Sequence, residues 1–350
     1  MKGMILAAGF GTRFRPATFE IPKPLIPLAN RPLIGWVLEA MLEARVREVV
    51  VNLHHLPLPL EQWLTSAYGD QCAFVFSREE EILGTGGAIR RVRKALEGEP
   101  FVLANGDTVQ SPPFERLAAT LEAESAVAAM LLRHPPAHDR FTEVFFDGRF
   151  VTGFGSGTGE PLMFAGAHAF SPEIFDRLPD TEVSGITEDV YLPMTRRGEK
   201  ALAGVVHDGM WFDIGTPARY LEATSAVLAA IREGSLPPTP GSRLTSDSLV
   251  ADDAAAEGEI ASSVLGEGAV VRGGGMVSRS VLWEGAMVDR DSKVEGSILG
   301  RGVALPRGAR VRNALVCRRL EGVDYPEGTL VIGEWVAAPV VEGDVKLEGF

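Results

Sequence analysis

The sequence predicts an α/β domain with a mostly parallel mixed sheet, followed by a parallel β-helix. Three observations lead to this prediction. Residues 1–232 alternate apolar strand-like runs with helix-like runs, the order that gives a parallel sheet covered on both faces. Residues 233–262 are rich in Gly and Pro and then in acidic residues and Ala, which is typical of a linker. Residues 263–350 contain a regular repeat, so we expect a second domain there.

The first domain begins with an apolar run over residues 2–8 that ends in a glycine-rich turn, which predicts a buried strand. Residues 33–45 carry apolar side chains at helical spacing, and the Val-rich run 48–53 predicts the next strand. The alternation then continues with a helix over 60–68, a strand over 73–76, a helix over 87–96, a strand over 101–104, a β-rich stretch over 126–170, and helices near 172–178 and 217–232.

The second domain repeats every 17 residues, in the blocks 264–280, 281–297, 298–314 and 315–331. Each block opens with two aliphatic residues, and the first three share a Gly at the fifth place and aliphatics at the eighth and fourteenth. Steps of about six, six and five residues suit one coil of a three-sided parallel β-helix, whereas the alternative is a Gly-rich β-sandwich. Arg319 stands where the fourth block should have Gly, so we expect that block to cap the stack.

The composition limits the classes of function. The chain has 350 residues, 45% hydrophobic and 23% charged, with a formal net charge of −13. This negative field disfavours a nucleic-acid partner or a membrane-binding face. The two cysteines are far apart in sequence and suit a reducing compartment, and no apolar run approaches the roughly 20 residues of a membrane span. We therefore expect a cytoplasmic protein.

A glycine-rich turn follows the first strand, at residues 9–13. Glycines let backbone N–H groups approach phosphates, and Arg13, Arg15 and Lys23 add three cations nearby. The turn lacks the Lys and Ser/Thr of a Walker A loop, and Phe14 replaces the third Gly of a dinucleotide-binding fingerprint. The residues alone leave open a phosphate site or a plain structural turn.

Two aspartates occupy positions suited to a metal. Asp107 follows a buried strand at the sheet edge where α/β proteins bind ligands, and Asp213 lies in an apolar run just before a helix. Mg²⁺ takes one or two carboxylates together with substrate phosphates and water. Each aspartate taken alone fits the role of a turn former or a helix cap better than that of a metal ligand.

Four motifs in order resemble the sugar-1-phosphate nucleotidyltransferases, especially the mannose-1-phosphate guanylyltransferase group with a C-terminal left-handed β-helix. They are Gly9-x-Gly11-Thr12-Arg13 with Pro22-Lys23-Pro24, Leu83-Gly84-Thr85-Gly86-Gly87-Ala88, Asn105-Gly106-Asp107, and Trp211-x-Asp213-Ile214-Gly215-Thr216. The resemblance implies a Rossmann-like catalytic domain and a left-handed parallel β-helix. It also implies an enzyme that forms an NDP-sugar and pyrophosphate from a nucleoside triphosphate and a sugar 1-phosphate, with Mg²⁺.

The resemblance also implies roles for individual residues. Arg13 would hold the departing pyrophosphate, Lys23 would contact the phosphates, and Asp107 and Asp213 would bind Mg²⁺. The residues expected to surround the nucleotide are Ala8, Gly9, Gly11, Thr12, Glu81, Leu83, Gly84 and Thr85. The residues expected to face the sugar are Asn105, Gly166 and Glu188.

One feature departs from the family pattern. Relatives often carry a Glu-Lys-Pro segment whose Lys meets the sugar phosphate, but residues 147–161 contain no Lys. No Lys occurs anywhere between Lys94 and Lys200, so Arg140 or Arg149 could substitute, or backbone N–H groups could bind instead. This departure affects the identity of the sugar more than the reaction.

The pattern Ser77-x-Glu79-x-Glu81 before the Leu83 turn looks most like the guanylyltransferases, and a carboxylate there suits the paired donors of guanine. A solvated acidic run is the alternative reading of these glutamates. We expect GTP with mannose 1-phosphate. The alternatives are a uridylyl- or thymidylyltransferase acting on glucose, N-acetylmuramate or heptose 1-phosphate, or a non-catalytic regulatory paralogue.

A bifunctional enzyme whose β-helix acylates an amino sugar is disfavoured, because all six histidines precede the repeats and none is left as a general base. We therefore interpret the β-helix as an assembly or regulatory module and expect a homo-oligomer formed through it. Because every candidate residue precedes the linker, residues 1–232 should be active alone.

Overall fold

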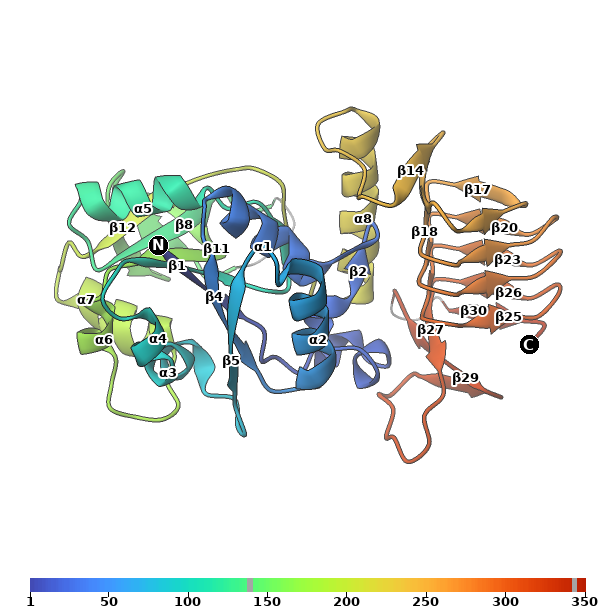
Figure 1. Cartoon of the computed structure of the whole chain (residues 1–350), viewed down its shortest axis with the longest axis horizontal. Helices are drawn as coiled ribbons and strands as arrows, with labels where there is room; N and C mark the ends of the chain where they lie inside the picture. Colours follow the sequence, from blue (N-terminus) through green and yellow to red (C-terminus); the bar gives the residue numbers. More distant parts are fainter. Residues whose placement is uncertain (137–140, 342–344) are drawn as a thin grey trace. The chain divides into compact units, whose positions relative to one another are not determined.

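The computed structural model describes residues 1–136, 141–341 and 345–350, in two compact units (Figure 1). The first unit comprises Met1–Phe10 and Ile34–Trp211, and the second comprises Gly11–Leu33 and Phe212–Phe350. The predicted boundary at residue 232 is the last residue of helix α8 (Pro217–Arg232). The contacts, however, group α8 and the early Gly11–Leu33 segment with the β-helix.

The first unit is built on a mixed, mostly parallel sheet, as predicted. Its central strand β1 (Lys2–Leu6) pairs in parallel with β4 (Glu48–Leu53) and β6 (Phe101–Asn105). Strands buried on both faces read as apolar runs, which is why β1 and β6 were recognisable. The other strands of this sheet are β5 (Ala73–Arg78), β8 (Ala128–Arg133), β9 (Val144–Phe146), β10 (Val151–Phe154), β11 (Glu160–Phe170) and β12 (Leu202–Val206). The short strand β7 (Thr108–Gln110) lies outside it. Strand β11 runs antiparallel to β6 and β8 and makes the sheet mixed.

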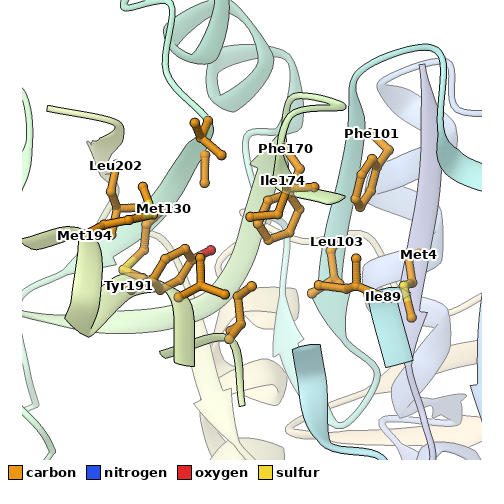
Figure 2. Packing of buried hydrophobic residues seen from close by; sticks show 14 of the residues in the cluster. Met4, Ile89, Phe101, Leu103, Met130, Phe170, Ile174, Tyr191, Met194 and Leu202 are labelled. Carbon is orange, nitrogen blue, oxygen red and sulfur yellow. The ribbon is translucent and has the colours of Figure 1, made fainter. Parts of the chain in front are cut away.

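The helices of this unit close its core. They are α1 (Leu33–Glu43, whose first residue belongs to the second unit), α2 (Pro57–Tyr68), α3 (Gly84–Arg91), α4 (Arg93–Leu96), α5 (Phe114–Ala123), α6 (Ile174–Arg177), the π-helical turn η4 (Thr187–Tyr191) and α7 (Leu192–Arg196). The helix predicted over 87–96 is two helices and begins earlier, at Gly84. Figure 2 shows side chains from the sheet and from the later helices packed into this core, among them Phe101, Phe170 and Tyr191.

The second unit begins with short elements and one long helix. The segment Gly11–Leu33 contains the 3₁₀ turns η1 (Thr12–Phe14), η2 (Ala17–Phe19) and η3 (Lys23–Leu25), and the hairpin of β2 (Pro27–Leu28) and β3 (Arg31–Pro32). Strand β13 (Trp211–Asp213) leads to α8. Thr216 caps α8, its hydroxyl accepting the Arg219 N–H, and Pro217 occupies the first turn, where no intrahelical donor is needed.

The 17-residue repeat forms a three-sided parallel β-helix, as predicted (Figure 1). The paired aliphatics stack in register, Val264 on Val281 and Val281 on Ile298, and their neighbours Leu265, Leu282 and Leu299 are fully buried. The coil strands are β18 (Val264–Leu265), β19 (Val270–Val271), β20 (Met276–Ser278), β21 (Val281–Leu282), β22 (Met287–Val288), β23 (Lys293–Glu295), β24 (Ile298–Leu299), β25 (Ala304–Leu305) and β26 (Arg310–Arg312).

Each corner of the coil uses a left-handed backbone residue at the same repeat position. The predicted Gly column, Gly268, Gly285 and Gly302, has φ between +61° and +67°, a region that glycine enters without strain. Beside another corner, buried serines form a ladder in which Ser263 Oγ accepts the Ser280 N–H and Ser280 Oγ accepts the Ser297 N–H. This ladder satisfies backbone donors that the tight corner would otherwise leave unpaired.

The predicted linker 233–262 is too long. Strands β15 (Ser248–Ala251), β16 (Ala255–Ala256) and β17 (Glu259–Ala261) form a first coil that pairs in parallel with the next, and β14 (Ser242–Thr245) pairs with β15. Leu249 pairs with Val264, only 15 residues on. Because this spacing is shorter and Ala replaces larger aliphatics, the 17-residue period does not reveal this coil in the sequence.

The stack ends as the sequence predicts. Strand β27 (Ala314–Arg318) continues the parallel ladder from β24 but pairs on its other side with β29 (Trp335–Pro339) in antiparallel fashion. Strands β28 (Leu330–Ile332) and β30 (Lys346–Glu348) are also antiparallel to their neighbours. The antiparallel strands cover the last coil and end the parallel repeat.

Candidate functional site

The predicted site residues divide between the two units, and each group is described within its own unit. Those in the first unit are Ala8, Gly9, Glu81, Leu83, Gly84, Thr85, Asn105, Asp107, Gly166 and Glu188. Those in the second unit are Gly11, Thr12, Arg13, Lys23 and Asp213. Ala8 is buried just after β1 and before the glycine-rich turn, whereas Gly9 is exposed with open space around it.

In the second unit, Gly11 allows a close approach between the turn and Lys23. Its φ is +61°, and a Cβ there would lie 2.9 Å from Thr18 Cγ2 and 3.0 Å from Lys23 Cβ. Thr18 Oγ1 donates to the Gly11 carbonyl over 2.9 Å, which fixes the turn. Thr12 is exposed, whereas Lys23 is 7% exposed. The structure therefore brings Gly11 and Lys23 together, and only Gly fits at position 11.

Arg13 lies against the turn that follows Asp213. A Cβ on Gly215 would be 2.9 Å from Arg13 Nη1, so the guanidinium covers this glycine. Asp213 is half-buried at the end of β13, two residues before Gly215. The fold thus brings a cation together with the turn that directly follows a predicted metal ligand, from distant parts of the sequence.

In the first unit, the Leu83–Thr85 turn is tied to the loop before Glu188. Ser184 donates its N–H to the Leu83 carbonyl, and its own carbonyl accepts from Gly86 N over 2.9 Å. Gly84 has φ +71°, and a Cβ there would lie 2.5 Å from the Ser184 carbonyl oxygen. The glycines of this motif therefore let two backbone segments touch. They bring the predicted base-contacting turn close to a predicted sugar-facing segment.

Two of the residues predicted to face the sugar, Gly166 and Asn105, lie together. Gly166 interrupts the pairing of β11 with φ +84°, and a Cβ there would be 3.0 Å from Asn105 Nδ2. Asn105 ends β6, and Asp107, half-buried, follows it. Glu188 is exposed, and its carboxylate folds back against Gly185.

Sequence reasoning did not identify Asn52 and did not place Glu79. Asn52 Oδ1 accepts the Ala7 N–H over 2.8 Å, and its Nδ2 donates to Glu79 Oε1 over 2.8 Å. Glu79 Oε2 accepts the Leu83 N–H over 3.1 Å. The signal that could have identified Asn52 is a polar amide side chain within the Val-rich buried strand β4. Because both oxygens of Glu79 bind protein donors, exposed Glu81 is the candidate for a carboxylate that contacts a base.

The histidines near these residues serve packing. His168 is fully buried beside Tyr191, with Tyr191 Oη 3.1 Å from Nδ1, and desolvation lowers the pKa of His168 to about 3. His54 Nδ1 lies 2.9 Å from the Glu79 carbonyl oxygen, and its ring meets Phe10 edge-on. Of the candidates for the sugar-phosphate cation, Arg149 is ion-paired with Glu124, and Arg140 lies outside the described residues.

Asp107 in the first unit and Asp213 in the second each offer a half-buried carboxylate, the kind of oxygen ligand that Mg²⁺ accepts. Among residues 1–136, 141–341 and 345–350, no group of three or more His, Cys, Asp or Glu side chains is arranged to hold a metal. A site with one or two carboxylates is what Mg²⁺ uses when phosphates and water complete its shell. Asp107 and Asp213 are the residues that would supply those carboxylates.

Three comparisons bear on these residues. Residues 2–230 match the family model described as nucleotidyl transferase, and residues 246–337 match a GlmU-like C-terminal hexapeptide model. The hexapeptide match agrees with the predicted left-handed β-helix. No helix within the described ranges is long and apolar enough to cross a bilayer.

Relatives with named activities are similar over about two thirds of this chain. A mannose-1-phosphate guanyltransferase 2 of Candida glabrata is 30% identical over 264 residues, 71% of each chain. An N-acetylmuramate alpha-1-phosphate uridylyltransferase of Neisseria meningitidis is 34% identical over 232 residues, 64% of this chain and 96% of that one.

A solved structure shares the fold. The crystal structure of HddC from Yersinia pseudotuberculosis has a TM-score of 0.55 and 22% identity, and the match covers 65% of this chain and 99% of that one. The four ordered motifs, the sheet and the family matches agree. This chain belongs to the nucleotidyl transferase family and is an enzyme of its sugar-1-phosphate nucleotidyltransferase branch.

Proposed function

We propose that the protein transfers the guanylyl group of GTP to mannose 1-phosphate or a closely related sugar 1-phosphate, giving GDP-sugar and pyrophosphate. The observation that carries the reaction type is the contact of Arg13 with Gly215, two residues after Asp213. Phosphoryl chemistry needs positive charge beside a metal-binding carboxylate, and here residues 200 positions apart supply both.

The reaction needs no covalent enzyme intermediate. An oxygen of the sugar phosphate attacks the α-phosphorus in line, a new P–O bond forms, and the bond to the β-phosphate oxygen breaks to release pyrophosphate. Arg13 would stabilise the negative charge on the leaving pyrophosphate, and Lys23 would contact the triphosphate from its buried position. Positioning and charge neutralisation by these groups account for most of the catalysis.

Asp107 and Asp213 would hold Mg²⁺, which when bound neutralises phosphate charge. Both carboxylates are half-buried, and a partly desolvated carboxylate attracts a cation more strongly than one in open water. Ala8, Gly9, Gly11 and Thr12 would present backbone N–H groups and a hydroxyl to the phosphates.

The preference for guanine rests on Glu81. It is exposed two residues before Leu83, and Glu79 is committed to Asn52 and Leu83. A carboxylate accepts from N1–H and N2–H of guanine together, a pair of donors that uracil and thymine lack. Leu83, Gly84 and Thr85 would border the base and ribose, and Asn105, Gly166 and Glu188 would face the sugar.

A second candidate is uridylyl transfer to an N-acetylmuramate-type sugar 1-phosphate. The observation that favours it is the higher identity, 34%, to the Neisseria meningitidis relative of that name. The lack of Lys between Lys94 and Lys200 also allows a sugar other than mannose.

A matrix of five nucleoside triphosphates against mannose, glucose, N-acetylmuramate and heptose 1-phosphates, scored by pyrophosphate release with Mg²⁺, tests both candidates. We expect the highest kcat/KM for GTP with mannose 1-phosphate. A preference for UTP with N-acetylmuramate 1-phosphate would select the second candidate, and no release with any pair would reject nucleotidyl transfer to these sugars.

We also propose that the protein is cytoplasmic and forms a homo-oligomer through the β-helix. Stacked coils present flat faces that suit association between copies. Light scattering of the full chain measures the mass directly, and a monomer at micromolar concentration would reject the oligomer.

A further inference from the structure

The Gly11–Leu33 segment carries Arg13 and Lys23 but has little regular structure of its own. Its longest elements are three-residue 3₁₀ turns, and its hairpin strands β2 and β3 have two residues each. Elements this short are marginally stable in isolation. The shape of the segment therefore depends on what it packs against in the second unit.

Tyr220 of α8 is the central contact of the segment. Its side chain is fully buried, its hydroxyl donates a hydrogen bond to the Pro27 carbonyl, and its ring meets Phe14 edge-on with centroids 5.6 Å apart. Burial raises the pKa of Tyr220, so the hydroxyl stays protonated and able to donate. Tyr220 thus touches the segment beside Arg13 and again four residues after Lys23.

Trp283 connects this contact to the β-helix. Its Nε1–H donates to the Tyr220 hydroxyl over 3.0 Å, and its side chain is 4% exposed. The backbone of Trp283 is fixed in the stack, because its N–H donates to the Leu299 carbonyl and its carbonyl accepts from Ala286 N. The indole donor is therefore held by the coil and orients the Tyr220 hydroxyl toward Pro27.

A second group of contacts fastens the same segment. Asn30 Nδ2 donates to the Leu265 carbonyl over 2.9 Å and lies 3.1 Å from Ser242 Oγ, and Thr239 Oγ1 donates to the Ala29 carbonyl over 2.6 Å. Ala29 and Asn30 have φ of +50° and +61°, a backbone region that disfavours side-chain-bearing residues. These bonds to the β-helix side help to hold that conformation.

We infer that Tyr220 and Trp283 are positioning residues, through which the β-helix holds the Gly11–Leu33 segment in the shape that presents Arg13 and Lys23. The expected effect on catalysis rests on the proposed function, because the proposed function assigns Arg13 and Lys23 to the phosphates. The β-helix is then part of the catalytic apparatus. This argues against activity of residues 1–232 alone, because Thr239, Leu265 and Trp283 all lie beyond them.

The test uses the full chain with Trp283→Phe and Tyr220→Phe, which keep an aromatic ring and remove hydrogen bonds of the relay. Hydrogen exchange read by mass spectrometry reports on the segment without any assumption about activity. We expect several-fold faster exchange in peptides from residues 11–33, with unchanged exchange in β1, β4 and β6. Trp63→Phe and Tyr68→Phe, on α2 in the first unit, are the matched controls and should leave residues 11–33 unchanged.

Kinetics then measure the consequence. We expect kcat to fall about tenfold in both relay variants, with the KM for the sugar 1-phosphate within about twofold, because misplaced phosphate cations slow transfer more than they weaken sugar binding. The double variant should lose little more than Tyr220→Phe alone, since both substitutions break one relay.

The outcomes separate the two proposals. Wild-type exchange and wild-type kcat in both variants would overturn the positioning role while leaving the proposed function intact. Faster exchange of residues 11–33 in a protein without turnover on any substrate pair would support the relay and reject the proposed function. If Tyr220→Phe fails to fold, Asn30→Ala tests the second group of contacts, and unchanged exchange there together with an unchanged Trp283→Phe would overturn the inference.

Discussion

Asn52 and Glu79 form a buried hydrogen bond of 2.8 Å that joins two separate sequence motifs of the first unit, both of which are expected to contact the nucleotide. Asn52 also accepts from Ala7 N, in the turn after β1, and Glu79 also accepts from Leu83 N, at the start of the Leu83–Thr85 turn. Both side chains are 4% exposed. The pair therefore sets the spacing between the backbone expected at the phosphates and the backbone expected at the base.

Glu79→Gln should destabilise the protein and weaken nucleotide binding. The new amide group would turn a donor toward either Asn52 Nδ2 or Leu83 N–H, each of which needs an acceptor. An unsatisfied buried donor costs about 1–3 kcal/mol, which urea unfolding would measure, and we expect the KM for the nucleotide to rise. Glu80→Gln, at an exposed neighbouring position, is the control and should leave both quantities unchanged. A Glu79→Gln protein of wild-type stability would contradict the structural role.

Asp107→Asn and Asp213→Asn should each fold normally and lose at least about 100-fold in kcat, because a neutral amide does not offset Mg²⁺ and phosphate charge. Circular dichroism and melting temperature check the fold, and pyrophosphate release at saturating Mg²⁺ checks turnover. Asp70→Asn, on an exposed turn, is the control and should keep full activity. Near-normal turnover in both site variants would remove the metal assignment.

Glu81→Gln should lower kcat/KM for GTP and leave kcat/KM for UTP nearly unchanged. The ratio of kcat/KM between the two nucleotides should therefore fall. The physical reason is the loss of a charge-assisted pair of hydrogen bonds to guanine. The measurement is kcat/KM for GTP, UTP, dTTP, ATP and CTP in wild type, Glu81→Gln and the exposed control Glu80→Gln. A wild-type enzyme that prefers UTP or dTTP would end the guanine interpretation without affecting nucleotidyl transfer.

His134 should make folding stability depend on pH. Its Nδ1 lies 2.7 Å from Asp208 Oδ2 and its Nε2 3.0 Å from Glu160 Oε1, and these bonds raise the pKa of His134. Burial by itself would raise the pKa of Asp208, but the hydrogen bonds from His134 outweigh it and lower that pKa. The stabilisation from protonated His134 is complete below about pH 6.5 and is lost as pH rises through its raised pKa.

The stabilisation from ionised Asp208 has the opposite pH dependence. It is lost as pH falls through the lowered pKa of Asp208. The melting temperature of wild type should therefore exceed that of His134→Gln most at about pH 5 and least at about pH 9. In a background with Asp208→Asn and Glu160→Gln, the same substitution should show no such trend. A difference in melting temperature that does not vary with pH would contradict the assignment.

Local patterns in the sequence predicted much of this protein. The 17-residue period gave the coils because each inward aliphatic, such as Leu282, must stack on the same position of the next coil. The apolar runs of β1 and β6 were recognisable because strands buried on both faces have no polar side. Prediction from local spacing failed where the spacing is irregular, as in the first coil, where Leu249 precedes its partner Val264 by 15 residues.

By itself, the sequence determined the two folds, the family and the residue types available for phosphate chemistry, because side-chain period, turn glycines and motif order are local properties. Only the tertiary structure decided that Glu79 is a buried partner of Asn52 rather than a base-contacting group. Only the tertiary structure also decided that Trp283 and Tyr220 hold the segment of Arg13 and Lys23. These relationships join residues separated by tens to hundreds of positions, and such contacts arise from packing that no local pattern encodes.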